Sequence, residues 1–207
     1  MNAFGRKEEI HEALTTLGRQ MALAYAGEVQ LLCCGGSGLC VLEILSRSTK
    51  DVDALAFIVD GHDLKPIETF SPEMNRAILA TARIHGLDED WFNAEATILL
   101  KHGLPEGILE RSSQHARQYG PCLRVQFIGR SDQVALKLYA AMDPVKGRRH
   151  EEDLVAMDPT KQEIKHALDW LCAWPSNEAF KKRLAFLVEG LGFGSLLPLK
   201  NNASEAP

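Results

Sequence analysis

VQLLCCGGS, residues 29–37, and STKDVD, residues 48–53, are the two stretches of sequence that decide the fold of this chain. The apolar run over 29–34 predicts a buried strand, and it leads directly into two glycines. A second apolar run over 52–59 predicts another strand, which opens on an Asp-x-Asp pair. Between the two strands, residues 39–45 predict a short helix. This order predicts polar groups at the point where a strand, a glycine turn and the next strand meet.

Asp51 and Asp53 are the first candidates for a functional site. Side chains at positions i and i+2 of a strand point to the same face, so we expect the two carboxylates side by side. Two adjacent hard oxygen ligands are what Mg²⁺ needs, with substrate phosphates completing its octahedral shell. The alternative is an ordinary turn or helix cap, because Ser-Thr-Lys-Asp is also typical of turns. Arg47 and Lys50 flank the pair, either as phosphate contacts or as solvated surface charges.

Gly35, Gly36 and Ser37 are the second candidates. A glycine has no Cβ, so the backbone N–H groups of such a turn can approach a phosphate closely. The Ser37 hydroxyl, at the start of a short helix, is a further donor for a phosphate. A phosphate-binding turn beside metal-binding carboxylates is the combination that nucleotidyl or phosphoryl transfer requires. The alternative is a tight strand-to-helix turn with close packing, which needs the same glycines.

The rest of the chain predicts one more strand and several helices. Ser71 as N-cap, Pro72 at the first helical position and a glycine directly after His85 predict a helix over 72–85. Alternation of apolar and polar residues over 123–128 predicts the third strand. The other predicted helices are 10–23, 133–142 with Ser131 and Asp132 as its cap, 160–173, and a last helix that Ser176 or Asn177 caps and that ends at about Glu189. Together these elements predict an α+β (mixed α/β) fold, with a small mixed sheet flanked by helices and followed by a helical C-terminal part.

Composition restricts the class of protein. The length of 207 residues suits one domain or a core domain with a helical appendage. The composition, 45% hydrophobic and 25% charged, has ordinary globular values. The net charge of −5 disfavours a general electrostatic attraction to nucleic acid. No apolar run is long enough to span a membrane and the charged N-terminal segment has no signal-peptide core, so we expect a cytoplasmic protein without a membrane partner. The 5 cysteines include no Cys-x-x-Cys pair and predict core thiols rather than disulfides or zinc.

The order of these motifs resembles the nucleotidyltransferase-fold superfamily, whose signature is Gly-Gly-Ser, a helical spacer and then Asp-x-Asp. GGSGLCVLEILSRSTKDVDAL, residues 35–55, matches this signature over its whole length. The closer resemblance is to the AbiEii-like branch of toxin-type nucleotidyltransferases and its bacterial relatives. In that branch a lysine-bearing helix and an Asp-Leu helix follow. This chain has ALKLYAAMD with Lys137 and RRHEEDLVAM with Asp153, and the resemblance covers about residues 28–157.

The resemblance implies a Mg²⁺-dependent nucleotidyltransferase that transfers NMP from an NTP to a hydroxyl acceptor on RNA or protein. It implies that Lys137 contacts the triphosphate and that Asp153 acts as a third catalytic carboxylate beside Asp51 and Asp53. Many members of the resembling branch are toxins of toxin–antitoxin or phage-defence pairs. A cognate antitoxin is therefore an implied partner.

Two departures from the family pattern favour an alternative. His150 stands where the stronger toxin pattern has an aspartate, and the strand over 123–128 offers Arg124 and Gln126 instead of a third strand carboxylate. The alternative is a catalytically degenerate nucleotidyltransferase-fold module that binds a nucleotide or a protein partner.

The predicted organisation of the chain has three parts. A nucleotidyltransferase-like domain covers 1–157, a C-terminal helical extension covers 158–193, and a flexible tail covers 194–207.

Overall fold

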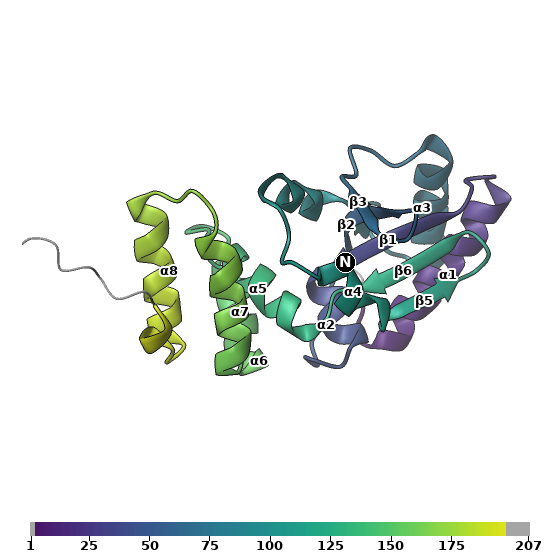
Figure 1. Cartoon of the computed structure of the whole chain (residues 1–207). Coiled ribbons are helices and arrows are strands. Elements are labelled where there is room, and N and C mark those ends of the chain that lie inside the picture. The colour runs from purple at the N-terminus through teal and green to yellow at the C-terminus, as the bar shows by residue number, and fades with distance from the viewer. Residues whose placement is uncertain (1–2, 198–207) are drawn as a thin grey trace, which may run out of the picture. The chain divides into compact units, whose positions relative to one another are not determined.

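The structure, a computed structural model, describes residues 3–197. The chain forms two compact units, Met1–Gln133 and Val134–Pro207. The predicted α+β fold class is confirmed, because a mixed six-stranded sheet with helices is followed by a helical C-terminal region (Figure 1). The functional division predicted at residue 157 remains a prediction. Of the predicted tail, residues 198–207 lie outside the described part of the chain.

The sheet belongs to the first unit and has the strand order β3-β2-β1-β6-β5, with β4 also pairing with β2. Its strands are β1 (Val29–Cys34), β2 (Val52–Val59), β3 (Asp63–Lys65), β4 (Phe92–Asn93), β5 (Ala116–Tyr119) and β6 (Leu123–Phe127). β1 runs antiparallel to β2 and parallel to β6. This central position buries β1 from Leu31 onward, which explains its continuous apolar run. The predicted bounds of β1 and β2 are confirmed.

Helices make up most of the remaining chain. The first unit contains α1 (Lys7–Leu23), α2 (Gly35–Val41), α3 (Pro72–His85), the 3-10 helix η1 (Glu95–His102) and α4 (Ile108–Ser113). α5 (Arg130–Ala140) runs from the first unit into the second, which continues with α6 (Arg148–Met157), α7 (Lys161–Cys172), α8 (Glu178–Gly190) and the 3-10 helix η2 (Gly194–Leu196). Across residues 3–197, no helix combines the length and apolarity that crossing a membrane would require.

Local capping signals predicted some helix ends well and others poorly. α3 is confirmed: the Ser71 hydroxyl accepts a hydrogen bond from the Met74 N–H at 3.1 Å, and Gly86 ends the helix in a left-handed conformation. The short helix predicted between β1 and β2 is present as α2, but its predicted bounds were wrong, because it begins at Gly35 and ends at Val41. The cap predicted for α5 was also wrong. That helix begins at Arg130, and the Asp132 carboxylate accepts two hydrogen bonds from the Arg111 guanidinium, at 2.9 and 2.7 Å.

α1 packs closely against β5 because a glycine stands at the point of contact. The apolar residues of α1 at helical spacing are fully buried, namely Ile10, Leu14, Leu17 and Met21. Between them lies Gly18, where a Cβ would fall 1.7 Å from the backbone carbonyl oxygen of Tyr119 in β5. Backbone cannot yield as a flexible side chain can, so only a residue without a side chain fits here.

Gly18→Ala should lower the free energy of unfolding of the protein by about 1–3 kcal/mol, the usual cost of overpacking. Urea denaturation followed by circular dichroism measures this change. Gly5→Ala is the control, because its Cβ would meet its nearest neighbour, Glu9 Oε2, at an ordinary 3.8 Å. Equal stability of the two variants would contradict a backbone contact between α1 and β5.

Candidate functional site

The glycine turn after β1 lies directly against the start of β2. Cys34 pairs with Asp53 in the antiparallel register, and Gly35 follows with φ of +77°, a conformation that favours glycine. A Cβ at Gly35 would fall 2.0 Å from Oδ2 of Asp53, so the carboxylate occupies the space that a side chain would take. The turn therefore needs glycine for close packing, and this packing brings one predicted carboxylate to the predicted phosphate-binding turn.

Gly36, the next residue of the turn, is covered by the loop that precedes β2. A Cβ at Gly36 would lie 2.5 Å from Oγ1 of Thr49 and 2.9 Å from Nη2 of Arg47. Arg47 thus brings a guanidinium group to the turn, and such a group recognises phosphate oxygens well. From the sequence, Arg47 was either a phosphate contact or a solvated surface charge. In the structure its guanidinium group lies at Gly36. Thr49 was missed, because no local pattern marks a residue that acts through a contact distant in sequence.

The loop before β2 is held in place from the N-terminal segment. The Phe4 N–H donates to the Thr49 carbonyl at 2.7 Å, and the Thr49 N–H donates to the Phe4 carbonyl at 3.0 Å. The Phe4 ring packs on the buried Trp91, with ring centroids 6.0 Å apart. The Val52 N–H donates to the Trp91 carbonyl at 2.7 Å, which fixes the start of β2 as well. Thr49, shortly before the Asp-x-Asp pair, and Val52, between its two aspartates, are therefore anchored to buried residues.

Asp51 and Asp53 are both partly exposed, while Val52 between them is fully buried. This alternation agrees with the prediction that the two carboxylates share a face. Thr49 Oγ1 donates to Oδ1 of Asp51 at 3.2 Å, which orients that carboxylate. Asn93 in β4 lies beside Asp53 in the parallel register and adds an amide at this position.

Two partly exposed carboxylates fit a Mg²⁺ ion that takes most of its remaining ligands from phosphate and water. Residues 3–197 contain no group of three or more His, Cys, Asp or Glu side chains arranged to hold a metal ion. A magnesium site here would consequently consist of Asp51 and Asp53, completed by the phosphates of a bound substrate. The assignment of the metal to these two residues remains a prediction.

Ser37 is placed differently from what a phosphate donor requires. Its side chain is fully buried, and its hydroxyl donates to the Cys34 carbonyl at 3.2 Å. This bond stabilises the change from β1 to α2. For Ser37, the structure thus supports the alternative of a tight strand-to-helix turn, and a phosphate contact through this hydroxyl remains a prediction.

Lys137 and Asp153 come together in the second unit, where they join α5 to α6. The Lys137 ammonium donates to Oδ2 of Asp153 at 2.7 Å, and the two side chains are only 7% and 5% exposed. Nδ1 of His150 lies 3.5 Å from the same ammonium. Lys137, His150 and Asp153, which belong to the two C-terminal motifs, are thus neighbours. Asp51 and Asp53 belong to the first unit, and a catalytic site that combines all four charged residues remains a prediction.

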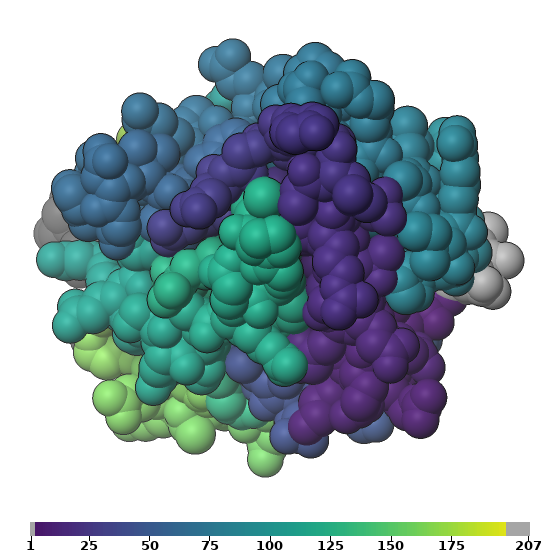
Figure 2. Space-filling view, turned by 90° about the vertical axis from the view of Figure 1, so that its right-hand side faces the viewer, coloured from purple at the N-terminus to yellow at the C-terminus, as the bar shows by residue number. Residues whose placement is uncertain are grey.

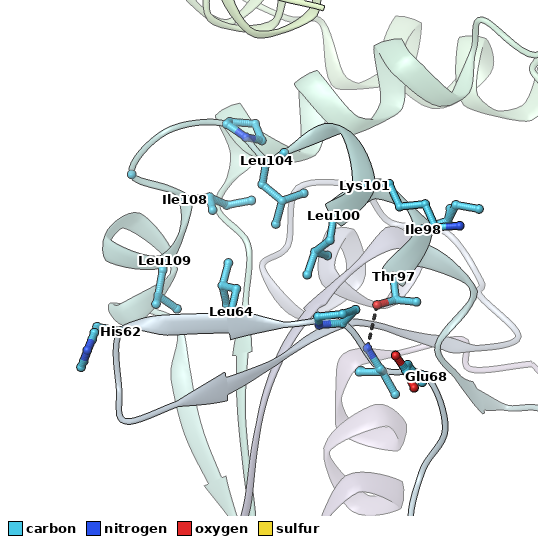
Figure 3. Close-up of a pocket in the computed structure, with 15 residues that line it drawn as sticks. His62, Leu64, Glu68, Thr97, Ile98, Leu100, Lys101, Leu104, Ile108 and Leu109 are labelled. Carbon is cyan, nitrogen blue, oxygen red and sulfur yellow. Dashed lines mark hydrogen bonds between the residues drawn. The ribbon is translucent and has the colours of Figure 1, made fainter.

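A separate cavity of about 830 Å³ lies in the first unit between β3, η1 and α4 (Figure 3). Most of its lining is apolar, including Leu64, Ile67, Ile98, Leu100, Leu104, Pro105, Ile108 and Leu109. The Ile67 N–H donates to Oγ1 of Thr97 at 2.9 Å and ties the chain after β3 to η1 (Figure 3). None of the predicted site residues lines this cavity, so it is distinct from the candidate catalytic site.

The prediction of core thiols holds for three of the five cysteines, because Cys122 is half-buried and Cys172 is exposed. All five are free thiols, and Cys33, Cys34 and Cys40 are buried. Burial raises the pKa of the Cys33 thiol well above its ordinary value and also raises that of Cys40. Protonated thiols are poor nucleophiles, so these residues contribute packing rather than chemistry.

Comparison with known proteins identifies no relative: no family model matches the chain, and no curated protein or solved structure is significantly similar to it. The resemblance to nucleotidyltransferases therefore depends on the motifs and on their order along the chain. The contact between the glycine turn and Asp53 is a geometric observation that is independent of that resemblance.

Lys137→Met should lower the free energy of unfolding by about 3–5 kcal/mol, because it leaves the Asp153 carboxylate buried without its cation. Lys137→Met/Asp153→Leu should recover most of that loss, since no charge is then buried. Urea denaturation of both variants measures the difference.

Lys165→Met is the matched control for this prediction. Lys165 pairs with Asp169 at 2.6 Å, but both side chains are 64% exposed. Removal of that exposed pair should cost less than about 1 kcal/mol. A loss in Lys137→Met no larger than in this control would mean that the buried pair contributes little to stability.

Proposed function

We propose that this protein is a Mg²⁺-dependent nucleotidyltransferase that transfers NMP from an NTP to a hydroxyl acceptor on RNA or protein. The observation that carries the proposal is the Asp53 carboxylate packed against the Cα of Gly35. The candidate metal-binding carboxylate and the candidate phosphate-binding turn then lie within one contact of each other. That proximity is what a metal bridging a protein and a triphosphate requires.

The proposal gives each group of the first unit a role. Asp51 and Asp53 hold Mg²⁺, and the backbone N–H groups of the turn at Gly35 and Gly36 donate to the phosphates. Arg47, which lies against Gly36, pairs with a phosphate oxygen. When bound, the metal neutralises the charge that develops on the α-phosphate and on the leaving pyrophosphate.

In the second unit, the proposal assigns Lys137 to the triphosphate and Asp153 to the acceptor hydroxyl as a base. The structure shows these two groups neutralising each other at 2.7 Å. Their participation would therefore require that the ion pair is exchanged for contacts with substrate. His150, close to the Lys137 ammonium, is a candidate to accept a proton in that exchange.

The wider biological role in the proposal comes from the resembling branch. There, toxins with a cognate antitoxin are common, and a protein antitoxin would be the natural partner here. A cytoplasmic location fits the five free cysteines, because thiols persist in a reducing compartment.

A second candidate function is a degenerate module that kept the fold and binds a nucleotide or a protein partner. Two observations favour it. The Ser37 hydroxyl donates to the Cys34 carbonyl, and Lys137 and Asp153 neutralise each other in a buried ion pair. In this function, the glycine turn and Asp53 are retained for packing alone.

Calorimetric titration of the four NTPs distinguishes the enzyme from a degenerate module that binds only a protein partner. The native protein should bind at least one NTP only when Mg²⁺ is present, and Asp51→Asn/Asp53→Asn should weaken that binding at least 10-fold, roughly 1.4 kcal/mol or more. The reason is that the amide oxygens cannot supply the charge that holds the metal against a triphosphate.

Asp60→Asn/Asp63→Asn is the matched control, since it removes two exposed carboxylates around the β2–β3 turn. This variant should bind the nucleotide as the native protein does. If the folded native protein binds no NTP, the enzyme proposal is wrong and the partner-binding module is favoured. Magnesium-independent binding that survives in Asp51→Asn/Asp53→Asn would place a nucleotide site elsewhere.

A further inference from the structure

A polar groove of about 450 Å³ lies on the first unit, away from the residues of the candidate catalytic site. All the residues that line it are polar or charged, namely His11, Glu12, Thr15, Thr16, Arg19, His85 and Arg117. They come from α1, from the last turn of α3 and from β5, and α1 packs against both other elements. Figure 2 views this side, where the purple surface of the N-terminal helix lies beside the teal-green surface of the segment that contains β5.

The charges that line the groove are mostly positive. Arg19 and Arg117 are permanent cations, and Glu12 is the one carboxylate among the lining residues. Within residues 3–197, neither arginine forms an ion pair with a carboxylate. The protein as a whole carries a net charge of −5, so a groove with two unpaired guanidinium groups departs from its average surface.

His11 is held at the groove by a buried partner. Its Nδ1 lies 2.7 Å from the hydroxyl of Tyr119, and Tyr119 is only 1% exposed. A buried hydroxyl without an acceptor is costly, so the Tyr119 O–H donates to Nδ1 and leaves the Nε2–H of His11 as a donor. Burial raises the pKa of Tyr119 and lowers the pKa of His11, which keeps both groups of this pair neutral.

Two further contacts hold His85 and Arg117, whereas Arg19 is exposed. Nε2 of His85 lies 2.9 Å from Oγ1 of Thr16, which links the end of α3 to α1. The Arg117 guanidinium lies 5.6 Å from the centroid of the Tyr119 ring, within the range of a cation–π interaction. Groups that are already held in place lose little conformational entropy when they bind a ligand.

We propose that this groove binds a small phosphomonoester at a site separate from the candidate catalytic site. Two guanidinium groups match the double negative charge of a phosphomonoester, and their planar forks suit its terminal oxygens. The groove is larger than one phosphate group needs, and its volume falls within the range of small-molecule sites. Glu12 then serves as an acceptor for a hydroxyl of the organic part.

Calorimetry with ribose 5-phosphate, inorganic phosphate and ribose tests the proposal at low salt. Ribose 5-phosphate should bind the native protein and bind at least 10-fold more weakly to Arg19→Gln/Arg117→Gln. Ribose should not bind. Asp51→Asn/Asp53→Asn should bind ribose 5-phosphate as the native protein does. The test of the groove is therefore independent of the test of the proposed enzyme.

Lys65→Gln/Arg76→Gln is the control for charge alone, because it removes two exposed cations of the same unit outside the groove. It should leave binding unchanged, and Arg19→Gln alone provides the test if the double variant does not fold. Binding of inorganic phosphate as tight as that of ribose 5-phosphate would overturn the organic part of the assignment. Absence of ribose 5-phosphate binding, or equal binding by Arg19→Gln/Arg117→Gln, would overturn the site itself. If the protein binds a single-stranded RNA but not ribose 5-phosphate, the ligand of the groove is a nucleic acid and not a small phosphomonoester.

Discussion

The contact between the Asp53 carboxylate and the Cα of Gly35 is the constraint on which the candidate site depends. It exists because β1 and β2 pair antiparallel with Cys34 opposite Asp53, so the turn after one strand meets the beginning of the other. Any side chain at Gly35 would displace the carboxylate, and a positive φ at this position already favours glycine. The same arrangement places the loop that carries Arg47 over Gly36. Backbone packing and the charges of the site are thus determined together.

The candidate site residues of the second unit form a buried ion pair. Lys137 and Asp153 are nearly inaccessible to water, so each charge depends on the other for the solvation that it has lost. Asp51 and Asp53 keep partial contact with solvent and can exchange water for a metal or a substrate at lower cost. The first pair of carboxylates is therefore suited to binding, whereas the buried pair is suited to holding α5 against α6. A catalytic role for the buried pair requires a substrate that replaces its internal contacts.

Two other hollows of the first unit differ in chemistry from the candidate site and from each other. The cavity between β3, η1 and α4 is lined mainly by aliphatic side chains, which favours an apolar occupant. The groove on α1 is lined by polar and charged side chains and favours an anion. The difference follows from α1 itself, because one side of this helix supplies the core while the opposite side supplies His11, Thr15 and Arg19.

The sequence by itself determined the elements that depend on local patterns. β1 and β2 follow from apolar runs, and α3 follows from its cap, its proline and its terminal glycine. The Asp-x-Asp pair and the glycine turn were also visible, because both lie within a few residues of a strand end. Only the tertiary structure decided the short strands β3, β4 and β5, the inward direction of the Ser37 hydroxyl, and the pairing of Asp132 with Arg111. The pairings of β4 with β2 and of Asp132 with Arg111 depend on partners far along the chain, which no periodicity or capping signal predicts. β3 and β5 are too short, at 3 and 4 residues, to show a period, and the local bond of Ser37 to the Cys34 carbonyl is one of two uses of that hydroxyl that the sequence allows equally.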